Sequence, residues 1–247
     1  MITWSKNRVD SLGEKLKRGG WTPELLTELE AYRESFADSY DFVVNRLSSL
    51  KHSVTGRPAK STGAIVDKLN RQSSRLSQIQ DIAGCRVVVS DVYLQQRAMF
   101  AVDAYLDGPH VYDRRKKPSH GYRAVHLVAD VAGKKVEIQL RTELQHLWAE
   151  VSEKMSDTLG PGLKYGEGDK RALQLLSNLS QLISDIEAEE FERIRFLALP
   201  EVREMGLTNK RLKKQVRKIE KDFFERKDRL FRVLHTLRDD SMGGIVA

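Results

Sequence analysis

An alternating stretch near the middle of the chain constrains the fold most. Residues 136–142 have the sequence VEIQLRT, in which apolar and polar side chains take turns. Successive side chains of a β-strand point to opposite faces, so the apolar residues can bury one face of a sheet while Glu137, Gln139 and Arg141 share the other. Two interpretations of that polar face are open: a sheet surface that faces solvent, or a surface that binds a polar ligand.

The flanking segments predict a mixed α/β fold. YRAVHLVADV (122–131) precedes the alternating strand, and the short AGKK between them predicts an antiparallel hairpin. The β-branched run GCRVVVS (84–90) predicts a buried strand, and turn-rich segments at 52–60 and 107–120 predict loops. Helical spacing predicts helices over 21–50, 61–71, 92–106, 143–155, 169–198 and 208–238. We therefore expect an α/β (α+β) fold, with a small mixed β-sheet flanked by helices.

The basic residues that give the chain its net charge are concentrated near its C-terminal end. Residues 208–239 hold twelve Lys and Arg against five Asp and Glu, which accounts for the whole formal net charge of +7. We expect one main domain over 1–200, with an N-terminal helix, and a basic helical extension over 201–247. A single cysteine excludes an intramolecular disulfide framework, residues 1–10 lack the apolar core of a secretory signal, and no apolar run approaches the length of a membrane span. The expected location is the cytoplasm.

Residues outside the alternating strand favour the ligand-binding interpretation. Asp81 comes just before the predicted strand at 84–90, and Arg86 interrupts that otherwise apolar strand. A buried arginine is costly without an anion or a stacking partner. Tyr122, at a loop edge, offers a flat ring to a base, and the basic residues around it offer contacts to phosphates. Those basic residues are Lys116, Lys117 and Arg123.

Two carboxylates on separate strands complete the pattern. Asp81 and Glu137, with an excess of Lys and Arg nearby, describe a site for Mg²⁺ and a nucleoside polyphosphate, because Mg²⁺ prefers one or two carboxylates plus phosphate oxygens. Phosphoryl transfer needs positioning, charge neutralisation and a base for the attacking hydroxyl. The sequence provides candidates for each.

Four motifs together resemble a known family. GRPAKSTGAIVDKL, DIAGCRVVV, KPSHGYRAVH and VEIQLRTELQHLWAE follow one another in the order and spacing of the RelA/SpoT-type synthetase domain. The resemblance covers roughly residues 25–195 and is closest to small, stand-alone members. It implies a nucleotidyltransferase-like fold and a Mg²⁺-dependent pyrophosphokinase. Such an enzyme transfers pyrophosphate from ATP to the 3′-hydroxyl of GDP or GTP and makes (p)ppGpp.

The resemblance also implies roles for residues on the donor side. Asp81 and Glu137 match the metal-binding acids, and Glu137 also helps to deprotonate the acceptor hydroxyl. Arg86 matches the arginine that stacks on the adenine of ATP, with Arg57 as its counterpart on the opposite face. Lys60 and Lys68 fall on positions that line the ATP phosphates.

On the acceptor side, Tyr122 matches the tyrosine that stacks on the acceptor base, and His126 matches a histidine that contacts acceptor phosphate. The remaining residues assigned to this side line phosphates or brace the metal-site strand. They are Lys117, Arg123, Gln139 and Arg141.

Departures from the family pattern keep alternatives open. The usual Arg-x-Lys spacing is stretched to Arg57-Pro-Ala-Lys60, His120 replaces the usual asparagine before Gly-Tyr, and Ala124 replaces a serine. The last two changes put the acceptor in question. Some stand-alone relatives are toxins that pyrophosphorylate the 3′-CCA end of tRNA, and others modify adenosine nucleotides. A catalytically silent nucleotide- or RNA-binding module is a further alternative.

The expected partners follow from these hypotheses. ATP and GDP or GTP are the substrates of the leading one, and the toxin alternative adds tRNA and an antitoxin protein. The basic C-terminal helix carries an apolar seam. It could close the domain, form a homo-oligomer interface or bind RNA through its Lys and Arg side chains. No membrane partner is expected.

Overall fold

The computed structural model describes residues 3–19, 21–50 and 53–239, which form two compact units. The first, here the sheet unit, comprises Met1–Val88, Ala98–Tyr112 and Val125–Leu140. The second, here the helical unit, comprises Val89–Arg97, Asp113–Ala124 and Arg141–Ala247. The domain limits expected from the sequence divide the chain differently and stay a prediction. None of the described helices combines the length and the apolar composition that a membrane span requires.

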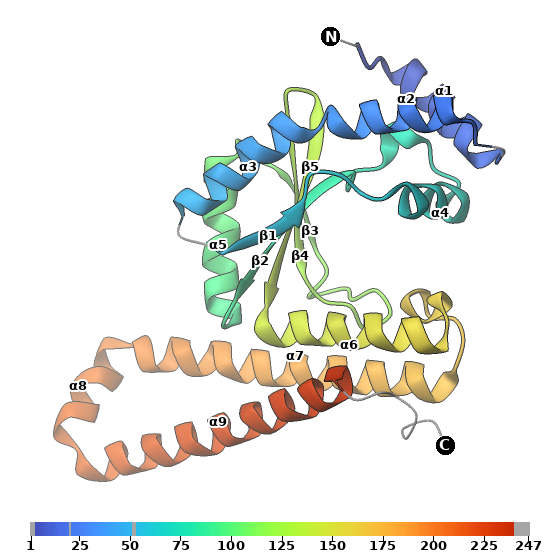
Figure 1. Ribbon diagram of the computed structural model, residues 1–247. Helices are drawn as coiled ribbons and strands as arrows, with labels where there is room; N and C mark the ends of the chain where they lie inside the picture. The colour runs from blue at the N-terminus through green and yellow to red at the C-terminus, as the bar shows by residue number, and fades with distance from the viewer. Residues whose placement is uncertain (1–2, 20, 51–52, 240–247) are drawn as a thin grey trace. The chain divides into compact units, whose positions relative to one another are not determined.

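A five-stranded sheet with the order β1-β2-β5-β4-β3 organises the sheet unit (Figure 1). Together with the surrounding helices it confirms the mixed α/β class. Pairing is antiparallel between β1 and β2 and between β4 and β5. The strands are β1 (Val54–Arg57), β2 (Ala83–Val89), β3 (His110–Asp113), β4 (Val125–Val131) and β5 (Lys134–Thr142).

The predicted hairpin is confirmed as the β4–β5 pair. Ala132 and Gly133 link the two strands with φ angles of 51° and 75°. Positive φ at both central residues is the mark of a type I′ turn, whose twist matches that of the strands. The turn fixes the register, in which Val128 lies opposite Glu137 and His126 lies opposite Gln139.

The two outer strands lie where the sequence predicted loops, so the loop predictions over 52–60 and 107–120 are wrong in part. The first residue of the loop predicted over 52–60, His52, lies outside the described residues. Each outer strand has four residues and is mostly exposed, so neither carries an alternating apolar face. Gly56 of β1 pairs with Cys85, whose Cα would lie 2.6 Å from a Cβ added at Gly56. A glycine therefore permits this pairing.

The helices of the sheet unit begin with one that the sequence did not predict, α1. The helix predicted over 21–50 is divided at Ser35 and Phe36, where the Ser35 hydroxyl donates to the Tyr32 carbonyl. Figure 1 shows α3 crossing the sheet, where Ser39 donates to the Val131 carbonyl at 3.0 Å. The helices are α1 (Lys6–Lys17), α2 (Pro23–Glu34), α3 (Ala37–Ser49), α4 (Thr62–Gln72), the 3₁₀ turn η1 (Leu76–Gln78) and the second half of α5 (Val92–Tyr105).

Three long helices build the helical unit around a common core. Leu147 and Met155 of α6, Leu176 of α7 and Leu234 of α9 are buried there. The join around Pro200 is itself helical, because proline is tolerated in the first turn of a helix. The elements are α6 (Glu143–Leu159), the 3₁₀ turn η2 (Pro161–Tyr165), α7 (Lys170–Ala198), α8 (Pro200–Thr208) and α9 (Lys210–Asp239).

The apolar seam of α9 is buried from Phe223 onward. Phe223, Leu230, Leu234 and Leu237 are buried, whereas Ile219 is 59% exposed. The C-terminal half of α9 therefore packs against α6 as part of the helical core.

Candidate functional site

Asp81 and Glu137 lie beside each other at neighbouring strands of the sheet unit. Asp81 precedes β2 by two residues, and β2 pairs with β5, which carries Glu137. A Cβ added at Gly84 would come within 3.3 Å of the Glu137 carbonyl oxygen and 3.7 Å of its Cβ. The two side chains are 18% and 16% exposed. Two acids that are 56 positions apart therefore lie near each other in a half-buried place, close enough for the Asp81 charge to raise the pKa of Glu137.

Two lysines hold the Asp81 carboxylate. Lys60 Nζ lies 2.6 Å from Oδ2, and Lys68 Nζ lies 2.8 Å from Oδ1. Lys60 is placed by its backbone N–H, which donates to the Ile82 carbonyl, and Lys68 is placed by α4, which Ser61 caps. Burial raises the pKa of Asp81, but the two ammonium groups outweigh it and hold that pKa below its ordinary value. Asp81 is therefore ionised at neutral pH.

Glu137 is fixed by two side chains on the same face of the β4–β5 hairpin. His126 Nδ1 lies 2.8 Å from Oε1, and Gln139 Nε2 donates to Oε2 at 2.8 Å. Both contacts follow from the register, because Gln139 is two residues from Glu137 and His126 lies opposite Gln139. Burial raises the pKa of Glu137, but His126 and Gln139 lower it further than burial and the nearby Asp81 charge raise it. Glu137 is thus also a carboxylate at neutral pH.

This pair has the donor set that Mg²⁺ prefers. No cluster of three or more His, Cys, Asp or Glu side chains suited to a metal ion occurs among the described residues, so Asp81 and Glu137 would need oxygens from a substrate to complete the shell. Mg²⁺ is usually bound in this way, through one or two carboxylates plus phosphates. The residues present therefore fit a magnesium ion that arrives with a nucleotide.

Arg57 and Arg86 lie on one face of the β1–β2 ladder. Arg86 is opposite Thr55, and Arg57 follows Thr55 by two residues, so both arginines project to the same side. Arg57 is exposed and Arg86 is half-buried. The structure brings the two predicted adenine-binding residues together, and their role stays a prediction.

Tyr122 and Arg141 contact each other in the helical unit. Arg141 Nη2 donates to the Tyr122 hydroxyl at 2.9 Å, and the guanidinium carbon lies 5.1 Å from the ring centroid. Gly121, with a φ of 89°, precedes the tyrosine, and a Cβ there would lie 2.7 Å from Trp148. The Gly-Tyr corner is thus fixed by close packing against α6.

The other acceptor-side candidates differ in accessibility. Lys117 is exposed. Arg123 braces its own segment instead, because Nη1 donates to the Arg115 carbonyl at 2.6 Å and Nε donates to Ser180 Oγ at 3.0 Å. Neither bond uses Nη2, and its predicted contact with an acceptor phosphate stays a prediction.

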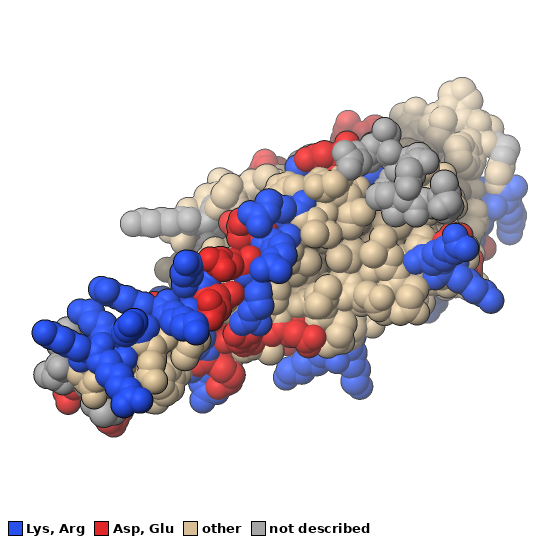
Figure 2. Space-filling view, turned by 90° about the horizontal axis from the view of Figure 1, so that it is seen from below, with Lys and Arg blue, Asp and Glu red and all other residues tan. Residues whose placement is uncertain are grey.

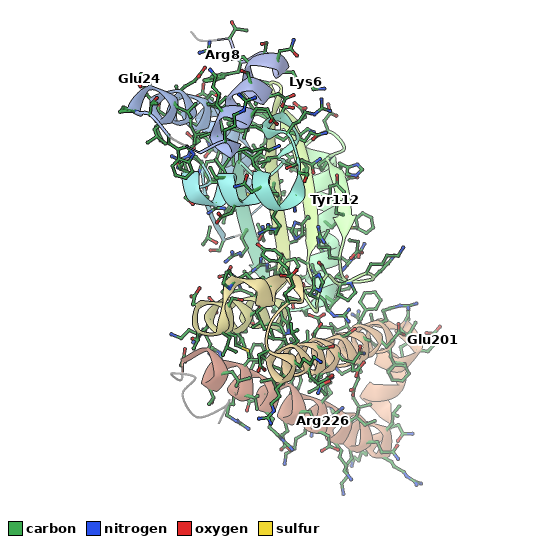
Figure 3. All side chains as sticks on the ribbon, turned by 90° about the vertical axis from the view of Figure 1, so that its right-hand side faces the viewer. Lys6, Arg8, Glu24, Tyr112, Glu201 and Arg226 are labelled. Carbon is green, nitrogen blue, oxygen red and sulfur yellow. The ribbon has the colours of Figure 1, made fainter. Side chains whose placement is uncertain are left out.

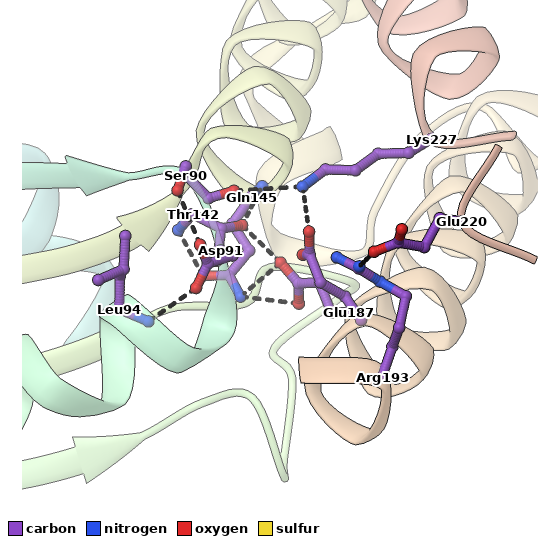
Figure 4. Close-up of polar contacts among 10 residues, drawn as sticks. Ser90, Asp91, Leu94, Thr142, Gln145, Glu187, Arg193, Glu220 and Lys227 are labelled. Carbon is purple, nitrogen blue, oxygen red and sulfur yellow. Dashed lines mark hydrogen bonds and ion pairs between the residues drawn. The ribbon is translucent and has the colours of Figure 1, made fainter. Parts of the chain in front are cut away.

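A buried polar cluster in the helical unit was missed from the sequence (Figure 4). Thr142 and Gln145 form a capping box at the start of α6, and Glu187 of α7 accepts hydrogen bonds from both side chains. Nearby, Lys227 of α9 contacts Glu190 at 2.6 Å and donates to the Ser90 carbonyl at 3.3 Å. The Thr-x-x-Gln pattern is a sequence signal for the capping box, but Glu187 is 42 residues further along.

We expect Glu187→Ala to destabilise the helical unit. The change removes the acceptor for Thr142 and Gln145 and leaves buried donors unsatisfied, which costs about 2–3 kcal/mol of unfolding free energy. Urea unfolding measures this loss. Glu192→Ala, on an exposed face of the same helix, serves as the control and should cost less than about 0.5 kcal/mol. Equal effects of the two changes would show that the cluster contributes no special stability.

A protein-family model matches residues 56–156, and it describes a region found in RelA and SpoT proteins. Residues 56–156 are a RelA/SpoT region. Every residue singled out from the sequence as a site candidate, from Arg57 to Arg141, falls inside it. The family resemblance seen in the four motifs is therefore confirmed.

Relatives of the RelA/SpoT region occur in mycobacteria. The uncharacterized proteins Rv1366 of Mycobacterium tuberculosis and Mb1401 of Mycobacterium bovis are each 35% identical over 176 residues, which cover 66% of this chain. The match spans 63% of the length of those relatives.

Solved structures share the fold. Small alarmone synthetase 1 from Bacillus subtilis, bound to its product pppGpp, matches with a TM-score of 0.54 and 24% identity, covering 72% of this chain and all of the other. A second structure of that protein gives 0.53 and 25%, with 70% and 97% covered. A GTP pyrophosphokinase family protein from Streptococcus pneumoniae gives 0.51 and 20%, with 70% and 93% covered.

Proposed function

We propose that this chain is a pyrophosphokinase that transfers the β,γ-pyrophosphate of ATP to the 3′-hydroxyl of GDP or GTP. The observation that carries the proposal is the pair of ionised carboxylates, Asp81 and Glu137, on neighbouring strands with two lysines against one of them. The RelA/SpoT region and the fold shared with small alarmone synthetases support the same activity.

On the donor side, Lys60 and Lys68 would exchange partners when ATP binds. Each ammonium now contacts a different oxygen of Asp81, and a polyphosphate offers more negative charge than one carboxylate. Moving the lysines to the phosphates would free Asp81, with Glu137, to hold Mg²⁺. Bound there, Mg²⁺ would neutralise charge on the phosphate oxygens.

On the acceptor side, Glu137 would take the proton of the attacking hydroxyl. The 3′-oxygen forms a bond to the β-phosphorus of ATP, the bond from that phosphorus to the α,β-bridging oxygen breaks, and AMP leaves. His126 and Gln139 hold the Glu137 carboxylate in one orientation, so that an oxygen can be presented to the hydroxyl without reorganisation.

The proposed stacking of the acceptor base on Tyr122 gives a separable prediction. Tyr122→Ala should raise the KM for the acceptor about tenfold, because stacking on an aromatic ring is worth about 1–3 kcal/mol per base. Tyr122→Phe keeps the ring and loses the hydroxyl to which Arg141 donates, so it should retain most of the affinity. Steady-state kinetics at saturating ATP measures both. A similar rise in KM for the two variants would assign the effect to the hydroxyl and not to the ring.

Transfer from ATP labelled in its β-phosphate tests the function directly. We expect AMP release and a labelled product with GDP or GTP. Label in a 3′-pyrophosphorylated adenosine nucleotide or in bulk tRNA, and in neither guanosine product, would contradict the proposed acceptor. No AMP with any acceptor would favour the catalytically silent module.

The tRNA alternative has one observation in its favour. The first nine residues of α9 carry six exposed basic side chains and no acid, and such clusters bind nucleic-acid phosphates. Figure 2 shows Lys and Arg side chains gathered at one end of the face in view. The six basic residues at the start of α9 are Lys210, Arg211, Lys213, Lys214, Arg217 and Lys218. An antitoxin partner, a homo-oligomer and a cytoplasmic location stay predictions.

A further inference from the structure

A cavity of about 590 Å³ lies in the sheet unit, apart from the carboxylate pair. Three segments enclose it: the start of α1, the η1 turn with Ile79 and Gln80, and the tip of the β4–β5 hairpin. The aromatic rings of Tyr32 and Phe36 close one side. Its volume is within the range of about 300–1,000 Å³ that is typical of small-molecule sites.

The lining of the cavity carries positive charge. Lys6, Lys134 and Lys135 line it, and none of its described lining residues is acidic. Figure 3 marks Lys6 on the first turn of α1. Within the described part of the chain none of the three lysines forms an ion pair, including Lys135, which lies opposite Asp130 in the hairpin register. Gln78 and Gln80 add side chains that can donate to an anion.

Lys134 is held in place without a counter-charge. Its Nζ lies 5.0 Å from the Tyr32 ring centroid and 4.6 Å from that of Phe36, and it donates to Ser35 Oγ at 2.7 Å. Burial lowers the pKa of this ammonium. Because taking a charge out of water is costly unless it is paired, an anion bound beside Lys134 would recover part of that cost.

Trp4 adds a ring surface to the same cavity. Its edge-on contact with Tyr32, at 5.1 Å between centroids, fixes its orientation. Arg8 lies 4.7 Å from the Trp4 ring centroid, but Arg8 lines a neighbouring hollow and not this cavity. The cavity therefore combines cations for phosphate with an indole for a planar ring.

From this combination we propose that the cavity is a second ligand site, which binds a nucleoside phosphate through Lys6, Lys134 and Lys135 with the base against Trp4. Two residues that line the site are close in sequence to the two carboxylates of the sheet unit. Gln80 directly precedes Asp81, and Lys135 precedes Glu137 by two residues on the same strand. A bound nucleotide is thus placed to influence the carboxylate pair through these two segments.

Binding can be localised by NMR of the tryptophan indole groups. The chain has three tryptophans, and Trp4→Phe assigns the Trp4 signal. We expect GMP or AMP to shift that signal saturably in the full-length protein, and guanosine and adenosine, which lack phosphate, to leave it unchanged. Trp21 is bonded to the Leu16 carbonyl outside the cavity and should not respond.

Charge variants identify the site. Lys6→Glu combined with Lys135→Gln should weaken the binding seen at Trp4 about tenfold or more, because each lysine supplies a charge-assisted contact. Lys15→Glu repeats the charge reversal of Lys6→Glu on the exposed side of α1 and should leave the affinity unchanged. A Trp4 signal that ignores both nucleotides, an equal response to the nucleosides, or an equal loss in the control variant would overturn the proposal. None of these readouts depends on catalysis, so the result is independent of the proposed reaction.

Discussion

Glu137→Gln should abolish pyrophosphate transfer while leaving the fold intact. The substitution removes the base and one negative ligand, so we expect AMP formation to fall by at least about 10³-fold. The fold should survive because His126 can still donate to the remaining oxygen, and the Gln139 amide can turn to accept from the new nitrogen. AMP release at saturating ATP and GDP measures the loss, and thermal unfolding checks the fold.

Glu153→Gln is a matched control for this prediction, because Glu153 is an exposed residue of α6. It should transfer at the wild-type rate. AMP formation by Glu137→Gln at the wild-type rate would show that Glu137 is neither the base nor a ligand of the ion. A large drop in thermal stability for Glu137→Gln alone would instead point to a structural role for the carboxylate.

The hairpin shows what a local pattern can predict about this fold. Alternation over 136–142 and a short polar link were enough to predict β4, β5 and their antiparallel pairing. The strands β1 and β3 carry no such pattern, because short exposed edge strands bury no continuous face. Helical spacing does not reveal the division of the predicted helix at Ser35 and Phe36, since Tyr32, Phe36 and Tyr40 keep that spacing across it.

Some residues of the candidate site could likewise be predicted from the sequence, and others could not. Asp81 and Glu137 were identified from their strand positions and from the family resemblance, and the structure places them together. The contact between His126 and Glu137 requires the register, which the two-residue turn sets. The role of Glu187 could not be predicted from the sequence. It lies in an acid-rich stretch of α7, and its burial depends on packing against a capping box that is remote in sequence.

Asp81→Asn should lower the rate of transfer and raise the requirement for Mg²⁺. If Asp81 is a ligand of the ion, we expect kcat to fall about 100-fold and the Mg²⁺ concentration for half-maximal rate to rise about tenfold or more. ATP affinity should be unchanged or tighter, since Lys60 and Lys68 lose their competing carboxylate. Magnesium titrations of AMP formation, with ATP binding measured separately, distinguish these effects. Asp67→Asn, an exposed change on α4, is the control.

The same variant should lose stability in a pH-dependent manner. The lysine contacts hold the folded-state pKa of Asp81 below its ordinary value, so their contribution is present above that ordinary value and is lost as the pH falls through the lowered one. The difference in unfolding free energy between wild type and Asp81→Asn should therefore be largest near neutral pH, at about 1–3 kcal/mol, and should shrink in acid. A stability difference with an unchanged Mg²⁺ requirement would mean that Asp81 only anchors the two lysines. Glu137 would then have to hold the ion with substrate oxygens, without a second carboxylate from this pair.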